Sequence, residues 1–299
     1  MSRSAGMRSF LFAPGNHQRH MEKTLEAPCD AVIADLEDAV AQSEKVNARA
    51  SVAQWLQRPR GERFAFVRVN ALSTPWAFDD LAGVVIRGLD GIVLPKAESA
   101  RDLHIADYVI SAHERSRELA SGSIEIMPIV ETAKGVENLR EIVRASQRVK
   151  RIAFGTGDYT NDTGTAWTLD NPLTVHYRAE FVNASRAAGI EPPIDAVWPY
   201  LQDEEGFAAE SHMARAMGFG GKLTIHPKQL ELVNRTFAPT AQEIAFARKV
   251  CDAFDAAEAA GSTAIVVDGA FVDYPVVYRA RAVLRGAAKA SPRAGRFES

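Results

Sequence analysis

The chain has 299 residues, 46% of them hydrophobic, and a formal net charge of −3, with lysine and arginine scattered rather than clustered. This balance is typical of a globular protein and gives no reason to expect nucleic acid or an anionic membrane as a partner. The two cysteines, Cys29 and Cys251, form no CxxC motif, which argues against disulfides and zinc. The first apolar run stops at Pro14, too early for a signal peptide or a membrane span. We therefore expect a cytoplasmic protein.

Short apolar runs that end in turn or polar residues recur along the chain. These eight candidate strands lie at residues 8–15, 31–39, 64–70, 91–96, 124–132, 151–158, 193–199 and 222–227. Segments with helical periodicity lie between them, at 17–27, 43–57, 76–88, 99–120, 135–146, 173–188 and 203–217. This alternation predicts an α/β protein with a (β/α)8 TIM barrel over residues 1–237. A doubly wound sheet is the main alternative, but neither a GxGxxG nor a GxxxxGK[ST] motif is present.

Residues 238–299 exceed what a barrel needs, and we expect them to form a C-terminal extension that acts as a lid. Residues 239–260 predict a long amphipathic helix with Thr240 as its N-cap. A β-hairpin turning on Asp268 and Gly269 should follow, and then a short helix from Pro275. The last ten residues, from 290 to 299, are expected to be disordered.

The stretch from residue 124 to residue 162 reads as strand, helix, strand, with one acidic residue after each strand. Because parallel strands end on one face of the sheet, Glu131 and Asp158 should lie side by side. Neighbouring carboxylates repel each other, which a shared proton or a bound cation relieves, and Mg²⁺ is typically held by one or two carboxylates. The alternative is that Glu131 caps the next helix and Asp158 begins a turn.

Other polar residues also fall at the carboxyl ends of the predicted strands. Charges are expensive to bury in strands unless they are paired or bind a ligand, so their gathering indicates an active site at the barrel mouth. Ion pairs that only stabilise the barrel are the alternative. The set comprises Asn16, His17, Asp35, Glu37, Asp38, Arg68, Asn70, Lys96, Glu131, Asp158, Trp198 and His226.

The runs FLFAPGNH, DLEDAV, VRVN, VLPK, ETAKGVEN, FGTGDYTNDTG and GFGGKLTIHPKQ, taken together and in this order, carry a family resemblance. From residue 8 to about 285 the chain resembles the citrate lyase β-subunit family, within the HpcH/HpaI aldolase superfamily. The resemblance implies a TIM barrel, Mg²⁺, a homotrimer or hexamer, and reversible Claisen-type cleavage of a 3-hydroxyacyl thioester.

The resemblance also implies roles for individual residues. Glu131 and Asp158 match the metal ligands, and Arg68 matches the arginine that faces the thioester enolate. Glu37 and Asp38 match an acidic cluster that holds metal-bound water. In members with a C-terminal lid an aspartate reaches the site, commonly that of a neighbouring subunit, and Asp273 is its match. The alternative is that Asp273 is only a turn residue of the hairpin. Lys96 and Asn16 are the candidates for binding the thioester or its acid; Lys96 could instead neutralise the carboxylates.

One departure concerns the segment GTGDY, where many relatives have GAEDY or GPxDL, so substrate preference is open at Thr156 and Gly157. The first functional hypothesis is a free-standing Mg²⁺-dependent lyase that yields acetyl-CoA and a 2-keto acid from a CoA thioester of malyl, citramalyl or citryl type. The alternatives are a citrate lyase β subunit acting on an acyl carrier protein thioester, a catalytically silent barrel, and a pyruvate aldolase acting on free acids.

Overall fold

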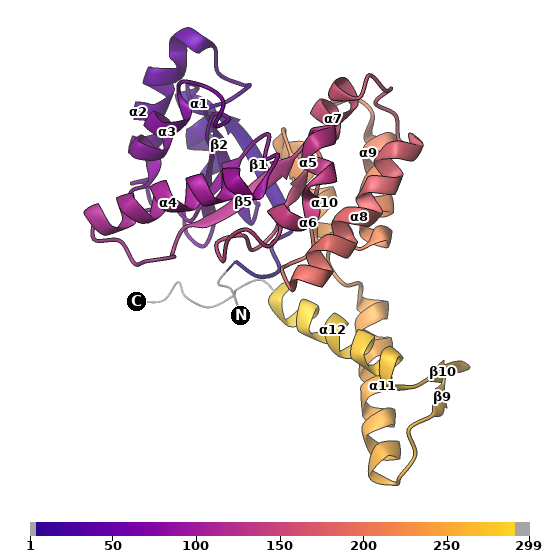
Figure 1. The fold of residues 1–299 in the computed structure, drawn as a ribbon. Helices are drawn as coiled ribbons and strands as arrows, with labels where there is room; N and C mark the ends of the chain where they lie inside the picture. Colours follow the sequence, from indigo (N-terminus) through magenta and orange to yellow (C-terminus); the bar gives the residue numbers. More distant parts are fainter. Residues whose placement is uncertain (1–3, 291–299) are drawn as a thin grey trace. The chain divides into compact units, whose positions relative to one another are not determined.

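The structure is a computed structural model that describes residues 4–290 (Figure 1). Eight parallel strands pair in sequence order, and β1 pairs with β8, so the sheet closes into a barrel. This confirms the predicted TIM barrel. The strands are β1 (Ser9–Pro14), β2 (Ala31–Asp35), β3 (Phe64–Arg68), β4 (Gly91–Leu94), β5 (Glu125–Val130), β6 (Ala153–Phe154), β7 (Ile194–Asp195) and β8 (Gly221–Thr224).

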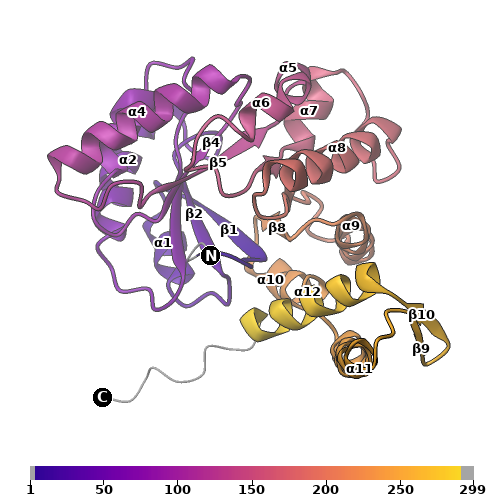
Figure 2. The same cartoon turned by 60° about the horizontal axis from the view of Figure 1, so that its bottom comes forward.

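Helices surround these strands, as Figure 2 shows for α2, α4, α6 and α8. The helices of the barrel are α1 (Gln18–Thr24), α2 (Lys45–Trp55), α3 (Ala77–Val84), α4 (Ala100–Ser116), α5 (Ala133–Glu137), α6 (Leu139–Ile142), α7 (Thr156–Asp162), α8 (Pro172–Ala188), α9 (Glu204–Met217) and α10 (Leu230–Thr236). Short 3-10 turns lie at η1 (Gln42–Glu44) and η2 (Pro227–Gln229). None of the helices in residues 4–290 is long and apolar enough to span a bilayer.

Three details differ from the sequence expectation. The last candidate strands are shorter, and β6 has only two residues, so Asp158 lies in the first turn of α7 rather than at a strand end. Neither α7 nor α10 was expected. The single helix expected over 135–146 is two short helices, α5 and α6, that meet at Asn138.

The barrel interior is filled by apolar side chains from alternate positions of the strands. Its buried cluster includes Phe10, Ile33, Phe66, Val93, Met127 and Ile129, and the rings of Phe10 and Phe66 meet edge to face. Such a packed interior leaves polar side chains only at the strand ends. The register then fixes which of them meet, because Asp35 at the end of β2 is the Cα partner of Arg68 at the end of β3.

A second group of buried charges joins β7 and β8 to the helices α8 and α9. Lys222 donates to Asp195 and to Glu210, at 2.6 Å each. Arg178 bridges the same two carboxylates at 2.8 Å. All four side chains are at most 3% exposed. Two cations and two anions satisfy one another here, so this closed network fastens the helices to the barrel.

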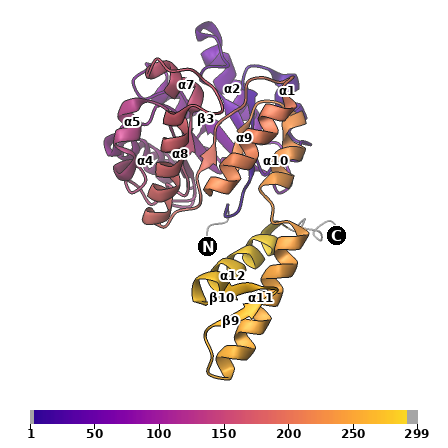
Figure 3. The same ribbon diagram turned by 90° about the vertical axis from the view of Figure 1, so that its right-hand side faces the viewer.

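The described residues from 235 to 290 form a second compact unit. It contains α11 (Ala241–Ala259), an antiparallel hairpin of β9 (Ile265–Val267) and β10 (Ala270–Val272), and α12 (Tyr274–Ala290), with the hairpin beside both helices (Figure 3). The predicted capping box at Thr240 and the turn at Asp268 and Gly269, both with positive φ, are present. The predicted short helix is instead 17 residues long. Apart from Ala290, the segment expected to be disordered lies outside the described residues.

Candidate active site

Glu131 follows the last residue of β5 and is buried at the barrel mouth. One of its carboxylate oxygens, Oε1, accepts the backbone N–H of Lys96 at 2.9 Å. Its other oxygen lies against Gly155, where a Cβ atom would collide with Oε2 and with the Cβ of Glu131. Glycine at position 155 is therefore what allows the carboxylate of Glu131 to sit beside the end of β6.

The charge state of Glu131 reflects this crowded position. The pKa of Glu131 is raised to about 8, first by burial and then by the nearby carboxylates of Asp158 and Glu37, against the lowering effect of the Lys96 N–H and of Arg68. The two acidic residues predicted to be neighbours are thus close enough to repel, although Asp158 reaches Glu131 from a helix. A cation bound between them would relieve that repulsion.

Arg68 is held in the mouth by a two-pronged ion pair with Asp35. Its Nε and Nη2 atoms donate to the two oxygens of Asp35 at 2.7 and 2.6 Å, and the guanidinium lies over the ring of Phe12. Burial alone would lower the pKa of Arg68, but the charges of Asp35, Glu37 and Glu131 raise it above its ordinary value. Arg68 is therefore a fixed cation, with its planar group oriented by Asp35.

Glu37 links Arg68 to Lys96. Its Oε2 atom lies 3.2 Å from Nη1 of Arg68, and its Oε1 accepts from Nζ of Lys96 at 2.7 Å. Burial raises the pKa of Glu37 in spite of these two cations. Lys96 adopts a left-handed backbone with φ of 49°, which is strained for a residue with a side chain. That conformation lets its N–H reach Glu131 while its ammonium reaches Glu37.

The remaining candidates are less closely tied to this cluster. Asp38 is exposed, and its carboxylate lies 3.8 Å from Nζ of Lys96. Asn16 follows β1, and its Oδ1 atom is buried with no hydrogen-bond partner among the described residues. Asp273 belongs to the second unit, where it precedes α12 and its backbone carbonyl accepts the N–H of Val277. Its predicted role in the barrel site stays a prediction.

The donor set fits a hard cation. No three His, Cys, Asp or Glu side chains gather as metal ligands within residues 4–290. A Mg²⁺ site needs fewer, because one or two carboxylates suffice when water and substrate oxygens complete the octahedron. Glu131 and Asp158 would hold the ion. The hydroxyl of Thr156, two residues before Asp158, is a further buried oxygen without a hydrogen-bond partner in the described part of the chain.

Two residues that the motifs did not bring out help to hold the site. Asp35, the last residue of β2, was only one of several acidic residues in the predicted set, and nothing in the sequence indicated that it, rather than Glu37, accepts both hydrogen bonds from Arg68. Lys45, at the start of α2, is buried and donates to the backbone carbonyls of Leu36 and Glu37. A lysine at a helix start reads as a surface residue, so only the structure reveals this contact.

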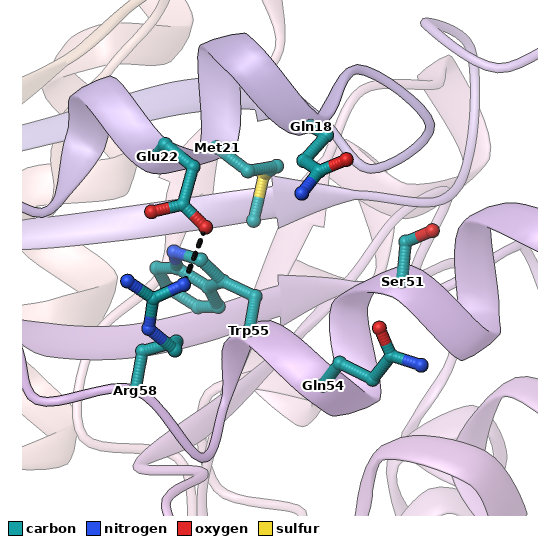
Figure 4. Close-up of a pocket in the computed structure, with 7 residues that line it drawn as sticks. All are labelled: Gln18, Met21, Glu22, Ser51, Gln54, Trp55 and Arg58. Atoms are coloured by element: carbon teal, nitrogen blue, oxygen red, sulfur yellow. Dashed lines mark hydrogen bonds and ion pairs between the residues drawn. The ribbon is translucent and has the colours of Figure 1, made fainter.

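A separate hollow of about 260 Å³ lies in the helix layer between α1 and α2. Figure 4 shows Met21 and Trp55 on its walls, and Glu22 and Arg58 joined by an ion pair of 2.7 Å. None of the predicted site residues lines it.

Comparisons with known proteins identify the family and agree with the fold. The chain matches the family model "HpcH/HpaI aldolase/citrate lyase" over residues 8–227. It is 38% identical to the citrate lyase subunit beta of Leuconostoc mesenteroides subsp. cremoris, over 93% of this chain and 92% of that protein. It is 36% identical to a (3S)-malyl-CoA thioesterase of Cereibacter sphaeroides, over 93% of both chains.

The crystal structure of the protein CitE from Mycobacterium tuberculosis, in complex with magnesium, acetoacetate and coenzyme A, superposes with a TM-score of 0.78. The two sequences are 30% identical, and the match covers 96% of this chain and 100% of CitE. A citrate lyase from Burkholderia xenovorans LB400 shares the fold with a TM-score of 0.84 over 97% of this chain and 95% of that one, at 21% identity. With its barrel, its mouth of opposed charges and these relatives, the chain belongs to the HpcH/HpaI aldolase/citrate lyase family and is a lyase.

Proposed function

We propose that the chain is a Mg²⁺-dependent carbon–carbon lyase that cleaves a 3-hydroxyacyl-CoA thioester of malyl, citramalyl or citryl type to acetyl-CoA and a 2-keto acid. The observation that carries the proposal is the buried Glu131, whose pKa of about 8 reflects burial and the nearby Asp158, with the fixed cation Arg68 close by. The similarity to CitE, whose crystals contained magnesium and coenzyme A, supports the cofactor and the substrate class.

The mouth can assist both halves of such a cleavage. A Mg²⁺ held by Glu131 and Asp158 would bind the carboxylate and hydroxyl oxygens of the substrate. It would thereby favour conversion of the hydroxyl to the carbonyl group of the keto acid. When the carbon–carbon bond breaks, its electron pair passes to the acetyl thioester as an enolate. Arg68 places a positive charge near that enolate, and because Asp35 already orients it, little reorganisation is needed.

Two proton transfers complete the reaction. The substrate hydroxyl loses its proton to a base, and the enolate carbon takes up a proton to give acetyl-CoA. We propose Asp273 as the carboxylate that takes the proton from the hydroxyl and returns it to the enolate carbon, because it matches the aspartate of the family's C-terminal lid. Lys96 and Glu37, which are already hydrogen-bonded to each other, keep the mouth's charges balanced while the substrate acid is bound.

The second candidate is a citrate lyase β subunit that acts on a citryl thioester of an acyl carrier protein within a complex. Similarity to the citrate lyase subunit beta of L. mesenteroides favours it. The similarity to the C. sphaeroides thioesterase supports hydrolysis of the thioester as an additional activity. The two candidates differ in one respect: a subunit of a complex needs its carrier, whereas a free-standing lyase turns over CoA thioesters alone.

We also propose a homotrimer or hexamer. The hairpin of the second unit exposes Val266 and Phe271, which are 70% and 63% exposed and are direct cross-strand partners. Tyr278 of α12 is exposed as well. Apolar side chains gathered in this way usually mark a surface that another protein covers.

The deciding experiment follows acetyl-CoA and keto acid formation from L-malyl-CoA, citramalyl-CoA and citryl-CoA by the purified protein with Mg²⁺. Turnover of one thioester, lost in Glu131→Gln and on chelation, is the expected result and names the substrate. Release of free malate or citrate with CoA would indicate hydrolysis. Mg²⁺ binding without turnover would favour the carrier-dependent subunit, and the absence of Mg²⁺ binding would overturn the proposal.

A further inference from the structure

The segment Leu36–Glu37, which follows β2, is fixed from several sides. The backbone N–H of Glu37 donates to Oδ1 of Asp35 at 2.9 Å, and its carbonyl accepts from Nζ of Lys45 at 2.7 Å. Its carboxylate contacts Arg68 and Lys96. The same carbonyl also accepts the backbone N–H of Val40 at 3.0 Å, so both the backbone and the carboxylate of Glu37 are held.

Lys45 contacts this segment from the helix layer. Its side chain is buried, and the ammonium donates to the carbonyls of Leu36 at 2.8 Å and of Glu37. It also lies 5.6 Å from the centre of the Trp76 ring. Two carbonyls and an aromatic face are an unusual set of partners for a lysine that is not paired directly with a carboxylate, and they cost it much of its hydration.

A second anchor holds the same segment. Asn70 donates through Nδ2 to the carbonyl of Leu36 at 2.9 Å and to Asp80 at 2.6 Å. Asp80, fully buried in α3, is paired in turn with Arg49 of α2 at 2.9 Å. Lys45 and Arg49 are four residues apart, so one face of α2 fixes the loop both directly and through Asp80.

We propose that Lys45 is a positioning residue of the active site, which holds Glu37 in place and through it the orientation of Lys96 and Arg68. This inference rests on the proposed function only for its effect on turnover; the effect on the loop is independent of it. Removing a group that orients the surroundings of a metal site typically costs 10- to 100-fold in metal affinity or activity. Lys45→Met keeps the length of the side chain and removes its three N–H donors.

The matched control is Lys222→Met, which removes another buried lysine of the barrel, one that contacts Asp195 and Glu210 rather than Glu37. Mn²⁺ binding, followed by electron paramagnetic resonance, should weaken about 10- to 100-fold in Lys45→Met and remain unchanged in folded Lys222→Met. Hydrogen exchange of the peptide covering residues 31–44 should accelerate only in Lys45→Met. That measurement needs neither metal nor substrate.

A double-mutant cycle with Glu37→Gln tests whether Lys45 acts through Glu37. The double variant should bind Mn²⁺ and turn over substrate no worse than Glu37→Gln alone, because coupled residues do not add their effects. Any of three results would overturn the proposal. These are losses of Mn²⁺ affinity and turnover that add in the double variant, equal hydrogen exchange of residues 31–44 in the two lysine variants, and unchanged Mn²⁺ affinity in Lys45→Met. If Lys45→Met does not fold, Lys45→Gln, which keeps two donors without the charge, is carried through the same cycle. If hydrogen exchange accelerates only in Lys45→Met but the wild type cleaves no thioester, the proposed function is refuted and the role of Lys45 in holding the loop is not.

Discussion

At the scale of single residues, the mouth of this barrel is a balance between two cations and a larger number of buried acids. Arg68 and Lys96 each contact Glu37, and Arg68 is additionally bound to Asp35. Glu131 receives only a backbone N–H from Lys96 among the contacts described above. Burial, together with this small compensation of its charge, explains its high pKa and makes it suitable as a ligand for a cation.

The raised pKa of Glu131 predicts how pH affects the metal-free protein. In the unfolded chain this carboxyl titrates near its ordinary value of 4.5, whereas in the folded protein it titrates at about 8. Between these values the folded state binds more protons, so the free energy of unfolding should fall as the pH rises from 4.5 to about 8. Urea unfolding with a chelator present measures this.

Glu131→Gln provides the comparison for that experiment. Glutamine cannot ionise, so the variant should be more stable than the wild type near pH 8 without metal, and its slope against pH should shrink to what Glu37 and other groups contribute. Adding Mg²⁺ should stabilise the wild type and not the variant. An identical pH slope in both proteins would show that Glu131 titrates normally.

The two hydrogen bonds from Arg68 to the carboxylate of Asp35 predict the effect of a lysine at position 68. Arg68→Lys keeps a positive charge but cannot donate to both oxygens of Asp35 in one plane. We expect turnover to fall on the order of 10²- to 10³-fold, with Mg²⁺ affinity changed much less, because the lost group acts on the enolate. Arg58→Lys, at the exposed ion pair with Glu22, is the control and should retain full turnover. Equal kcat values for Arg68→Lys and wild type would remove Arg68 from the proposed chemistry.

At the scale of elements, the strand pattern was readable from sequence because each strand of a closed parallel barrel is buried on both faces. The run 91–96 is an example, since Gly91–Leu94 is buried at every position. The residue at which β6 ends could not be predicted from the sequence. Residues 151–158 have the composition of a strand, but only Ala153 and Phe154 pair with neighbouring strands, and the chain turns into α7 at Thr156. Tertiary packing, which composition does not encode, decides that boundary.

Gly155 lies between β6 and α7, and the proposed metal site depends on the absence of a side chain there. A Cβ atom at this position would collide with Oε2 and Cβ of Glu131. Gly155→Ala should therefore displace the carboxylate, weaken Mg²⁺ binding by at least 10-fold and cost about 1–3 kcal/mol of stability. Isothermal titration with Mg²⁺ and thermal unfolding measure the two effects.

The control for Gly155→Ala is Gly286→Ala in α12, where a Cβ would meet nothing closer than an ordinary contact with Pro239. Alanine favours a helix interior over glycine by roughly 0.5–1 kcal/mol, so this variant should be slightly more stable, with Mg²⁺ affinity unchanged. Tight Mg²⁺ binding by a folded Gly155→Ala would show that Glu131 does not need its present position to hold a cation.

At the scale of the whole molecule, the sequence indicated which face of the barrel carries the chemistry but not how its charges are connected. Strand order brings Glu37, Arg68, Lys96 and Glu131 to one mouth, and that much follows from alternating strands and helices. The pairing of Arg68 with Asp35 depends on the register between β2 and β3. The hydrogen bond from Lys45 to the carbonyl of Glu37 depends on how α2 packs against the barrel. Neither leaves a periodic signal in the sequence.

The role predicted for Asp273 concerns the assembly and gives the last prediction. If this aspartate completes the site of a neighbouring subunit, Asp273→Asn and Glu131→Gln should each be inactive alone. Co-expressed with different tags and purified as mixed oligomers, they should regain activity, because some sites then combine an intact barrel from one subunit with an intact Asp273 from another. Random assembly would restore about one quarter of the sites. Mixed oligomers with no activity would place Asp273 in the site of its own chain, whereas an active Asp273→Asn would exclude it from proton transfer altogether.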